Sequence, residues 1–339
     1  MRKIYVESSC MTNPYTGIGK TINNLVNSLK EIGEDVITIS FNDSEEKNEF
    51  LYYNSFLPKY CKRNLNNEDI FLIPNNLSKF WRLPHSNTWV IMHDVIPLSK
   101  YGYSRIKKIP YRIKLKLLKK ASRIITISEY VKKNLIDLGL ANGCDISVLY
   151  WSFEKSIFPE STTCLDLPDN YFIGIGTGEK RKCIDFVIKN WQPLAADNTH
   201  LLLFGGEAYP GAQKKLQSLI QDYDLSTHIH LLGKISETKL FHLYKHAKGL
   251  IFSSEEEGFG LPPLEALSVN TPVVMPATPI NFELYKEIAL FYSLGQKEQF
   301  YKACKMAQNI KTMNWDYSDF LSKFSQQIFK EKLNQIFKI

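Results

Sequence analysis

The sequence predicts an α/β protein with two doubly wound, Rossmann-like domains that face a central cleft, followed by a C-terminal helix. Three observations carry this prediction: short runs rich in Ile, Val, Leu and Phe recur along the chain, amphipathic helical patterns separate them, and the whole series occurs twice. Strands that are apolar throughout are typical of parallel sheets with helices on both faces. Such sheets bind ligands at the carboxyl ends of their strands.

Six strands are predicted in each half of the chain. In the first half they are KIYVES, DVITIS, DIFLIP, TWVIMH, ASRIITIS and DISVLY, and in the second half YFIGIG, HLLLFGG, HIHLLG, GLIFSS, TPVVMP and IALFYS. We therefore predict one domain over residues 1–155 and a second over residues 171–312. Residues 156–170 are predicted to be a linker, because that segment has no regular period and holds prolines and a Ser/Thr cluster.

The C-terminal residues 313–339 predict an amphipathic helix. Apolar side chains recur there at roughly helical intervals, at Phe320, Phe324, Ile328 and Leu333.

Composition places the chain among soluble globular proteins. It has 339 residues, of which 44% are hydrophobic and 23% charged, enough for about two domains. We find no uninterrupted apolar run of about 18 residues, and the apolar part of MRKIYVESSC is too short for a secretory signal, so we predict a cytoplasmic protein. The six cysteines lie far apart with no C-x-x-C pair, which indicates reduced, structural thiols.

The formal charge of +7 is unevenly placed. The segment from Lys100 to Lys133 contains twelve cations and a single acid, Glu129, and Ile109 and Ile113 with Leu117 and Leu118 recur there at helical spacing. The segment therefore predicts a basic amphipathic helix. Two interpretations stay open: a solvated face whose apolar side packs on its own domain, or a surface for anionic membrane. Nucleic acid is not predicted, because no recognisable binding module surrounds the segment.

The stretch EEEGFGLPPLEAL, residues 255–267, follows the predicted strand GLIFSS and leads into a helix opened by proline. Glycines let the backbone approach a ligand, and helix N-terminal amides favour a phosphate. The turn would consist of Gly258, Phe259, Gly260 and Leu261. Glu265, expected in the first helical turn, could accept ribose hydroxyls, and Glu257 could accept from another polyol. For Glu265 alone, an acid that merely stabilises the helix N-terminus is the alternative.

These residues resemble a known family. EGFGLPPLE followed by ALSVNTPVV resembles the E-x7-E signature of family 4 of the retaining glycosyltransferases, which have the two-domain GT-B fold. GIGTGEKRKCIDFVI is similar to the family's Gly-Thr segment with a basic pair, although Cys183 stands where the family often has Asn. LLGKISETKLFHLYKHAKGLIFSS, HDVIPL and ASRIITISEYVKKNL resemble further family segments. The likeness runs in order through most of residues 15–290.

The resemblance implies a role for each motif in the donor site. Glu265 would bind the donor ribose and Glu257 the donor sugar, while the amides of residues 258–261 would lie near the diphosphate. Because three glutamates are adjacent, the register rests on Glu257 preceding Gly-Phe-Gly, and we expect Glu255 and Glu256 to be exposed. The second domain would be the donor domain and the first the acceptor-side domain.

Five further residues are assigned by the resemblance. Arg181 and Lys182 would neutralise the departing diphosphate, where fixed cations gain strength as charge grows. The family's glycine loop, facing the donor phosphates, would correspond to Gly17 and Gly19. His93, at the carboxyl end of the strand TWVIM, would hydrogen-bond a hydroxyl of the transferring sugar. Asp94 could orient His93 or sit in a local turn, and the sequence leaves both open.

Other functional classes find no support. A dinucleotide motif would need glycine at Ile22, and a phosphate loop of the nucleotide hydrolases would need glycine at Pro14. Asp222-Tyr223-Asp224 spells the D-x-D string of metal-dependent transferases, but it ends a helical segment and we interpret it as surface. No metal site and no cofactor are predicted.

The sequence thus predicts a retaining glycosyltransferase that moves a hexose, with mannose the first candidate, from a GDP- or UDP-linked donor to a saccharide or lipid-linked saccharide. Its place would be cell-surface polysaccharide or lipopolysaccharide biosynthesis, in the cytoplasm or peripherally at the inner membrane face. The alternatives are a GT-B sugar epimerase or phosphorylase, or a catalytically silent sugar-binding subunit of an assembly complex.

Overall fold

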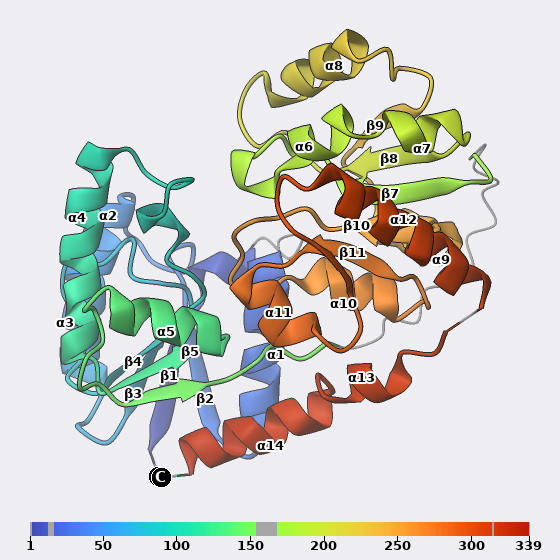
Figure 1. Ribbon diagram of the computed structural model, residues 1–339. Coiled ribbons are helices and arrows are strands. Elements are labelled where there is room, and N and C mark those ends of the chain that lie inside the picture. Colours follow the sequence, from blue (N-terminus) through green and yellow to red (C-terminus); the bar gives the residue numbers. More distant parts are fainter. Residues whose placement is uncertain (1, 13–16, 154–167, 314, 339) are drawn as a thin grey trace. The chain divides into compact units, whose positions relative to one another are not determined.

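A computed structural model describes residues 2–12, 17–153, 168–313 and 315–338. The chain divides into two compact units, Met1–Ser152 with Phe324–Ile339, and Phe153–Lys323. Each unit contains one sheet of six parallel strands with helices packed on it (Figure 1). All twelve predicted strands are present, which confirms the predicted α/β class.

The first sheet has the strand order β2-β1-β3-β4-β5-β6. Its strands are β1 (Lys3–Glu7), β2 (Asp35–Ile39), β3 (Ile70–Ile73), β4 (Thr88–Met92), β5 (Arg123–Thr126) and β6 (Ile146–Val148). β3 and β4 are buried along their whole length, as expected for strands covered on both faces. The direction of winding changes between β1 and β3, and such a switch point opens a crevice at the strands' carboxyl ends.

The helices of the first unit include one from the far end of the chain. They are α1 (Gly17–Glu31), α2 (Glu49–Leu51), α3 (Leu57–Asn64), α4 (Arg105–Leu115), α5 (Glu129–Asp137) and α14 (Gln326–Phe337), with the short turns η1 (Ser9–Thr12), η2 (Tyr52–Phe56), η3 (Ile96–Leu98) and η4 (Lys116–Lys120). α14 packs on α1, as Figure 1 shows in red and blue. The Gln326 amide donates to Asn24 and Ser28 of α1, both at 2.7 Å, which fastens the C-terminal helix to this unit.

The second sheet has the strand order β12-β11-β10-β7-β8-β9. Its strands are β7 (Tyr171–Ile175), β8 (His200–Phe204), β9 (Ile229–Gly233), β10 (Gly249–Ile251), β11 (Val273–Pro276) and β12 (Leu290–Tyr292). Here the switch point lies between β7 and β10, which are neighbours in the sheet although 73 residues separate Ile175 from the start of β10 at Gly249 in the numbering of the chain. Ligand chemistry is therefore expected where these two strands end.

The helices of the second unit cover this sheet. They are α6 (Ile184–Lys189), α7 (Gln192–Ala196), α8 (Ala212–Asp222), α9 (Glu237–His246), α10 (Leu261–Leu267), α11 (Pro279–Tyr285), α12 (Lys297–Thr312) and α13 (Ser318–Ser322), with the turn η5 (Lys180–Lys182). Trp191 is fully buried in the core, and its indole N–H donates to the carbonyl of Thr199 at 3.1 Å. α12 packs against β10, β11 and β12.

The C-terminal segment differs from the prediction of a single amphipathic helix. It forms two helices, α13 and α14, and the side chain of Ser325 caps the second by accepting from the amide of Ile328. Phe320, Phe324 and Leu333 are buried as predicted, but Ile328 is exposed, because the break between the helices changes its register. Of the predicted linker, residues 156–167 lie outside the described residues.

The structure also tests the predictions for the D-x-D string and for the basic segment. Asp222, Tyr223 and Asp224 are exposed at the end of α8, which confirms that the D-x-D string is surface. The basic segment is not one amphipathic helix: α4 ends at Leu115, η4 follows, and the chain then enters β5. Across the described ranges, every helix is too short or too polar to span a bilayer.

Candidate functional site

Two loops meet at the switch point of the second sheet. One follows β7 and runs through residues 176–183, and the other follows β10 and runs through residues 252–260. Because β7 and β10 are paired and parallel, both loops emerge at the same edge. They are joined directly: the amide of Glu255 donates to the carbonyl of Arg181 at 2.8 Å, and the Ser253 hydroxyl donates to the carbonyl of Lys182. The sequence places these segments far apart, and the sheet topology brings them together.

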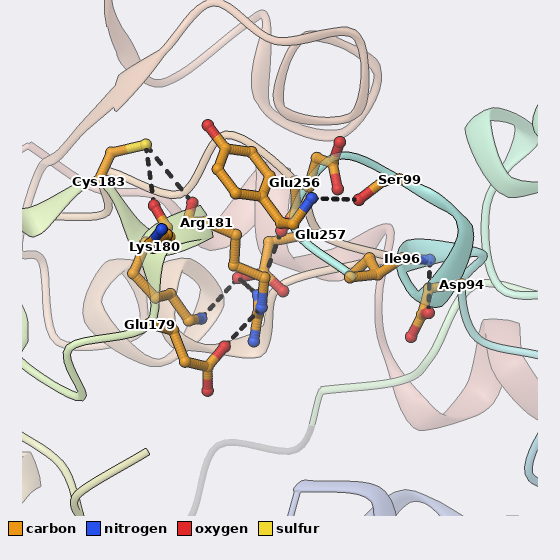
Figure 2. Close-up of polar contacts among 11 residues, drawn as sticks. Asp94, Ile96, Ser99, Glu179, Lys180, Arg181, Cys183, Glu256 and Glu257 are labelled. Carbon is orange, nitrogen blue, oxygen red and sulfur yellow. Dashed lines mark hydrogen bonds and ion pairs between the residues drawn. The ribbon is translucent and has the colours of Figure 1, made fainter. Parts of the chain in front are cut away.

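The Glu257 carboxylate forms ion pairs with both predicted cations. Its Oε1 lies 2.7 Å from Nη1 of Arg181 and 2.5 Å from Nζ of Lys182. These three side chains are only 13%, 21% and 12% exposed. Arg181 also pairs through Nε with Oε2 of Glu179 at 2.6 Å, so its guanidinium lies between two carboxylates (Figure 2).

Electrostatics keep this cluster charged. Burial alone would raise the pKa of Glu257, but the positive charges of Lys182 and Arg181 together outweigh burial and hold its pKa below the ordinary value. The Glu257 carboxylate is thus ionised at neutral pH. Removing one member of such a buried group leaves an uncompensated charge, which typically costs about 3–5 kcal/mol.

The turn after β7 has almost no room for side chains. A Cβ on Gly176 would lie 2.7 Å from Cβ of Leu203, and Gly178 has φ +75° with Ala212 close by. Between them, the buried hydroxyl of Thr177 has no hydrogen-bond partner among the described residues. An unmet buried hydroxyl costs about 1–3 kcal/mol, so this position favours a ligand atom that supplies the missing bond. The sequence analysis did not single out Thr177.

Cys183 ends the same loop in the left-handed conformation, with φ +48°. L-residues pay about 1–2 kcal/mol for this conformation, and Gly and Asn adopt it most readily. The departure noted in the sequence, cysteine where the family often has Asn, therefore falls on a position whose backbone favours Asn. The Cys183 thiol contacts the carbonyls of Lys180 and Arg181 at 3.6 and 3.7 Å (Figure 2).

The turn at residues 258–261 leads into α10. Gly260 has φ +92°, and a Cβ there would lie 3.1 Å from the Phe252 ring, so glycine is required. α10 begins at Leu261 with prolines in its first positions, and prolines have no N–H, so the amide donors of this turn belong to residues 258–261. Glu265 is the fifth residue of α10. The expectation that it lies in the first turn is wrong, because the helix begins before the prolines.

Two buried tyrosines hold this turn and helix, and the sequence analysis missed both. The Tyr244 hydroxyl donates to Oε2 of Glu265 at 3.3 Å from α9, and the Tyr285 hydroxyl donates to the carbonyl of Gly260 at 2.6 Å from α11. In the sequence each is one apolar position of an amphipathic helix, with no signal for its partner. Tyr244 therefore fixes the rotamer of Glu265, and Tyr285 fixes the turn.

The neighbours of Glu257 were expected to be exposed, and that expectation is wrong. Glu255 and Glu256 are half-buried, because their loop lies against the 179–183 turn. Arg181 donates to the carbonyl of Glu256 at 3.2 Å, and one carboxylate oxygen of Glu256 is buried without a partner among the described residues.

The first unit contributes a second set of predicted residues. His93 follows β4 and is buried, with Nε2 at 2.8 Å from the carbonyl of Pro74 and its ring 5.5 Å from that of Trp151. Burial lowers the pKa of His93 to about 4, although the hydrogen bond to Pro74 opposes this. The imidazole is neutral, Nε2 carries the proton donated to Pro74, and Nδ1 is left as the acceptor atom.

Asp94 accepts from the amide of Ile96 at 2.9 Å, which places it in a local turn (Figure 2). Gly17 and Gly19 lie in the first turn of α1, Gly17 exposed and Gly19 buried, and residues 13–16 before them lie outside the described residues. Glu7, which ends β1, is buried and accepts from the amide of Ser9 at 3.1 Å and from Tyr53 at 3.3 Å. Glu7 thus fixes the start of the loop toward α1, a role the sequence did not signal.

The structure therefore groups the predicted residues into two sets. Arg181, Lys182 and Glu257 are in contact, and the 258–261 turn and Glu265 belong to the same unit, whereas Gly17, Gly19 and His93 belong to the other. In the described part of the chain, no three His, Cys, Asp or Glu side chains are grouped so that they could bind a metal ion.

Comparison with known proteins gives a family match over the range that contains this site. Residues 163–308 match the family described as glycosyl transferases group 1, and that range contains the whole 176–183 and 252–265 site. The O-antigen chain mannosyltransferase RfbU of Salmonella typhimurium is 27% identical over 246 residues, which are 72% of this chain and 67% of RfbU.

Solved structures share the fold over the whole chain. Sucrose-phosphate synthase of Thermosynechococcus elongatus has a TM-score of 0.76 at 15% identity, covering 100% of this chain and 98% of that one. Anabaena HepE, solved in complex with UDP, has a TM-score of 0.68 at 14% identity and covers 100% of both chains.

The two sheets and the likeness to these solved structures show the GT-B fold. Residues 163–308 match the glycosyl transferases group 1, and the comparisons support a hexosyltransferase.

Substitutions at Cys183 test the backbone strain at the site. We expect Cys183→Asn to raise the free energy of unfolding by up to about 1 kcal/mol and Cys183→Val to lower it by about 1–2 kcal/mol, because Asn tolerates the left-handed region and a β-branched residue does not. Chemical denaturation followed by circular dichroism measures both. Equal stability of the two variants would show that the backbone at residue 183 is not strained.

The free energy of unfolding should depend on pH in the way expected for a neutral, buried His93. Its folded pKa is about 4, below the ordinary 6.5, so the unfolded chain takes up a proton first as pH falls. Stability contributed by this site is full above about pH 6.5 and is lost toward pH 4, by roughly 1.4 kcal/mol per unit. We expect the stability difference between wild type and His93→Gln to change with that slope between pH 6.5 and 5. A constant difference would mean that His93 titrates normally.

Proposed function

We propose that this enzyme transfers mannose from GDP-mannose to a growing saccharide or a lipid-linked saccharide, with retention of anomeric configuration, in the synthesis of a cell-surface polysaccharide. The observation that carries the proposal is the Glu257 carboxylate shared by Arg181 and Lys182 at the β7/β10 switch point. Mannose is supported by the name of the relative RfbU, an O-antigen chain mannosyltransferase.

The donor diphosphate would bind by exchanging partners with the ion-paired cluster. Arg181 and Lys182 would turn toward the phosphate oxygens, and Glu257 would then accept hydrogen bonds from the hydroxyls of the donor sugar. The amides of Gly258, Phe259, Gly260 and Leu261 would contact the diphosphate, and the orphan hydroxyl of Thr177 would reach a phosphate oxygen. Glu265, held by Tyr244, would accept the two ribose hydroxyls.

Retention follows if the acceptor attacks on the face from which the diphosphate departs. The bond from the anomeric carbon to the phosphate oxygen breaks, the bond to the acceptor oxygen forms, and the acceptor's proton passes to the departing phosphate. No protein nucleophile is required. Arg181 and Lys182 stabilise the charge that grows on the leaving group, the role that a metal ion has in other transferases, so we propose that catalysis needs no metal.

The first unit, residues 1–155, would supply the acceptor side, and residues 171–312 the donor domain. Gly17 and Gly19 would let the backbone of α1 approach the donor phosphates. His93 would accept a sugar hydroxyl at Nδ1, since Nε2 is committed to Pro74. Because His93 stays neutral, it would act by orientation and not as a general acid.

The acceptor and the basic surface of the first unit suggest where the enzyme works. We propose that it is cytoplasmic and associates peripherally with the inner membrane face, where a lipid-linked saccharide is presented. No nucleic acid is expected as a partner.

The donor proposal is tested first by ligand-induced stabilisation. A ligand that binds only the folded protein raises its melting temperature, and at equal concentration a tighter ligand raises it more. We expect GDP to give a larger thermal shift than UDP or ADP at equal concentration, with the same result in EDTA. GDP-mannose with a manno-oligosaccharide acceptor should then give GDP and an α-linked product by NMR. A larger shift with UDP would exclude the GDP donor, and a β-linked product would exclude retention.

The ion-paired cluster is tested by Lys182→Met, which keeps the side-chain length and leaves Glu257 paired with Arg181. We expect Lys182→Met to lower kcat by about 10²–10³-fold, because it removes a cation from the developing charge. The matched control is Lys180→Met, an exposed cation in the same turn, which should change kcat little. If both lysine variants lose activity equally, the effect is general surface charge and not the cluster.

A further inference from the structure

Helix α4 has two apolar faces, and only one of them packs on its own unit. Tyr111 and Leu115 are buried, whereas Ile106, Ile109 and Ile113 are 81%, 63% and 50% exposed. At about 100° per residue, the three isoleucines lie within roughly 60° of one another and on the side of the helix opposite Tyr111 and Leu115. Of the two interpretations left open by the sequence, packing on the own domain does not hold for Ile109 and Ile113, because other residues fill the inward face.

Cations border this isoleucine stripe, which we define as Ile106, Ile109 and Ile113, along both edges. By the same helical spacing they are Arg105, Arg112 and Lys116 on one edge and Lys107 and Lys114 on the other. No acid occurs between Asp94 and Glu129. The arrangement is an exposed apolar ridge with positively charged margins.

Two exposed aromatic residues contact side chains of α4. Tyr103, one helical turn before Ile106, is 42% exposed and packs edge-on against Tyr111 at 5.5 Å. Trp81 is 45% exposed, and the Lys114 ammonium lies 4.7 Å from its ring centre. Tyrosine and tryptophan side chains of this kind are typical of the boundary between water and lipid.

We propose that the isoleucine stripe of α4 inserts into an anionic phospholipid bilayer while the flanking cations bind the headgroup phosphates. This deepens the proposed peripheral association, on which it rests, by naming the surface that makes the contact. A bilayer fits better than a second copy of this chain, because two such surfaces would bring like charges together. It also fits better than a nucleic acid, which offers no apolar phase for three isoleucines. Apolar burial and charge act together in such helices.

The test is co-sedimentation with vesicles of phosphatidylcholine alone and of phosphatidylcholine mixed with phosphatidylglycerol. We expect the wild type to bind the anionic vesicles, less so at high salt. The variant Ile106→Ser/Ile109→Ser/Ile113→Ser should bind at least tenfold more weakly, since the apolar contribution is lost. The matched control is Ile136→Ser/Ile328→Ser, which removes isoleucines of 42% and 44% exposure from α5 and α14 and should bind as the wild type does.

Three outcomes would overturn the proposal: no binding by the wild type, equal binding by the stripe variant, or a wild-type dimer that the stripe variant abolishes without any effect on vesicles. GDP-induced thermal shift and hydrolysis of GDP-mannose, both measured without lipid, should be the same in all three proteins. Failure of the proposed transfer would appear in these lipid-free assays of the wild type, whereas failure of the stripe would appear only with vesicles.

Discussion

The site depends on one carboxylate oxygen that two cations share. Glu257 is buried, and a buried carboxylate is stable as an anion only if its partners repay the lost hydration. Lys182 and Arg181 do this, to the extent that the pKa of Glu257 falls despite burial. The same contact connects the loop after β7 with the loop after β10, because the cations come from one and the carboxylate from the other. Charge balance and loop geometry are thus a single constraint.

The sheet topology explains why this contact forms where it does. β7 and β10 are neighbours at the switch point of the sheet, so the loops that follow them leave from the same edge. Glycines lie in that region: Gly176 approaches Leu203 too closely for a Cβ, and Gly260 has φ +92°. The hydroxyls of Tyr285 and Tyr244 then hold the carbonyl of Gly260 and the carboxylate of Glu265 in place. Backbone packing therefore determines the shape of the loops after β7 and β10, and the charged side chains project from this backbone.

Much of this could be predicted from the sequence, and the failures share a cause. The twelve strands could be predicted because short, continuous apolar runs are typical of buried strands in a parallel sheet. The E-x7-E and Lys-Arg-Lys segments could be predicted because each is a local pattern in the sequence. Contacts between distant segments have no such pattern, so Tyr244 under Glu265 and the Glu257 pairing with Arg181 could not be derived. The exposure of Ile109 and the half-burial of Glu256 depend on which face of a helix or loop the rest of the unit covers, and that is decided by packing and not by periodicity.

The two units differ in the charge state of their buried ionisable side chains. In the second unit, Glu257 remains ionised, because the positive charges of Lys182 and Arg181 lower its pKa. In the first, His93 is held neutral by burial, and its one remaining acceptor atom is unaffected by pH down to about 4. A transferase of this class gains from both arrangements, because a departing diphosphate needs permanent positive charge, whereas a sugar hydroxyl needs an acceptor that does not become a cation and compete for that diphosphate. The chemistry proposed for this enzyme thus requires no proton transfer to the protein.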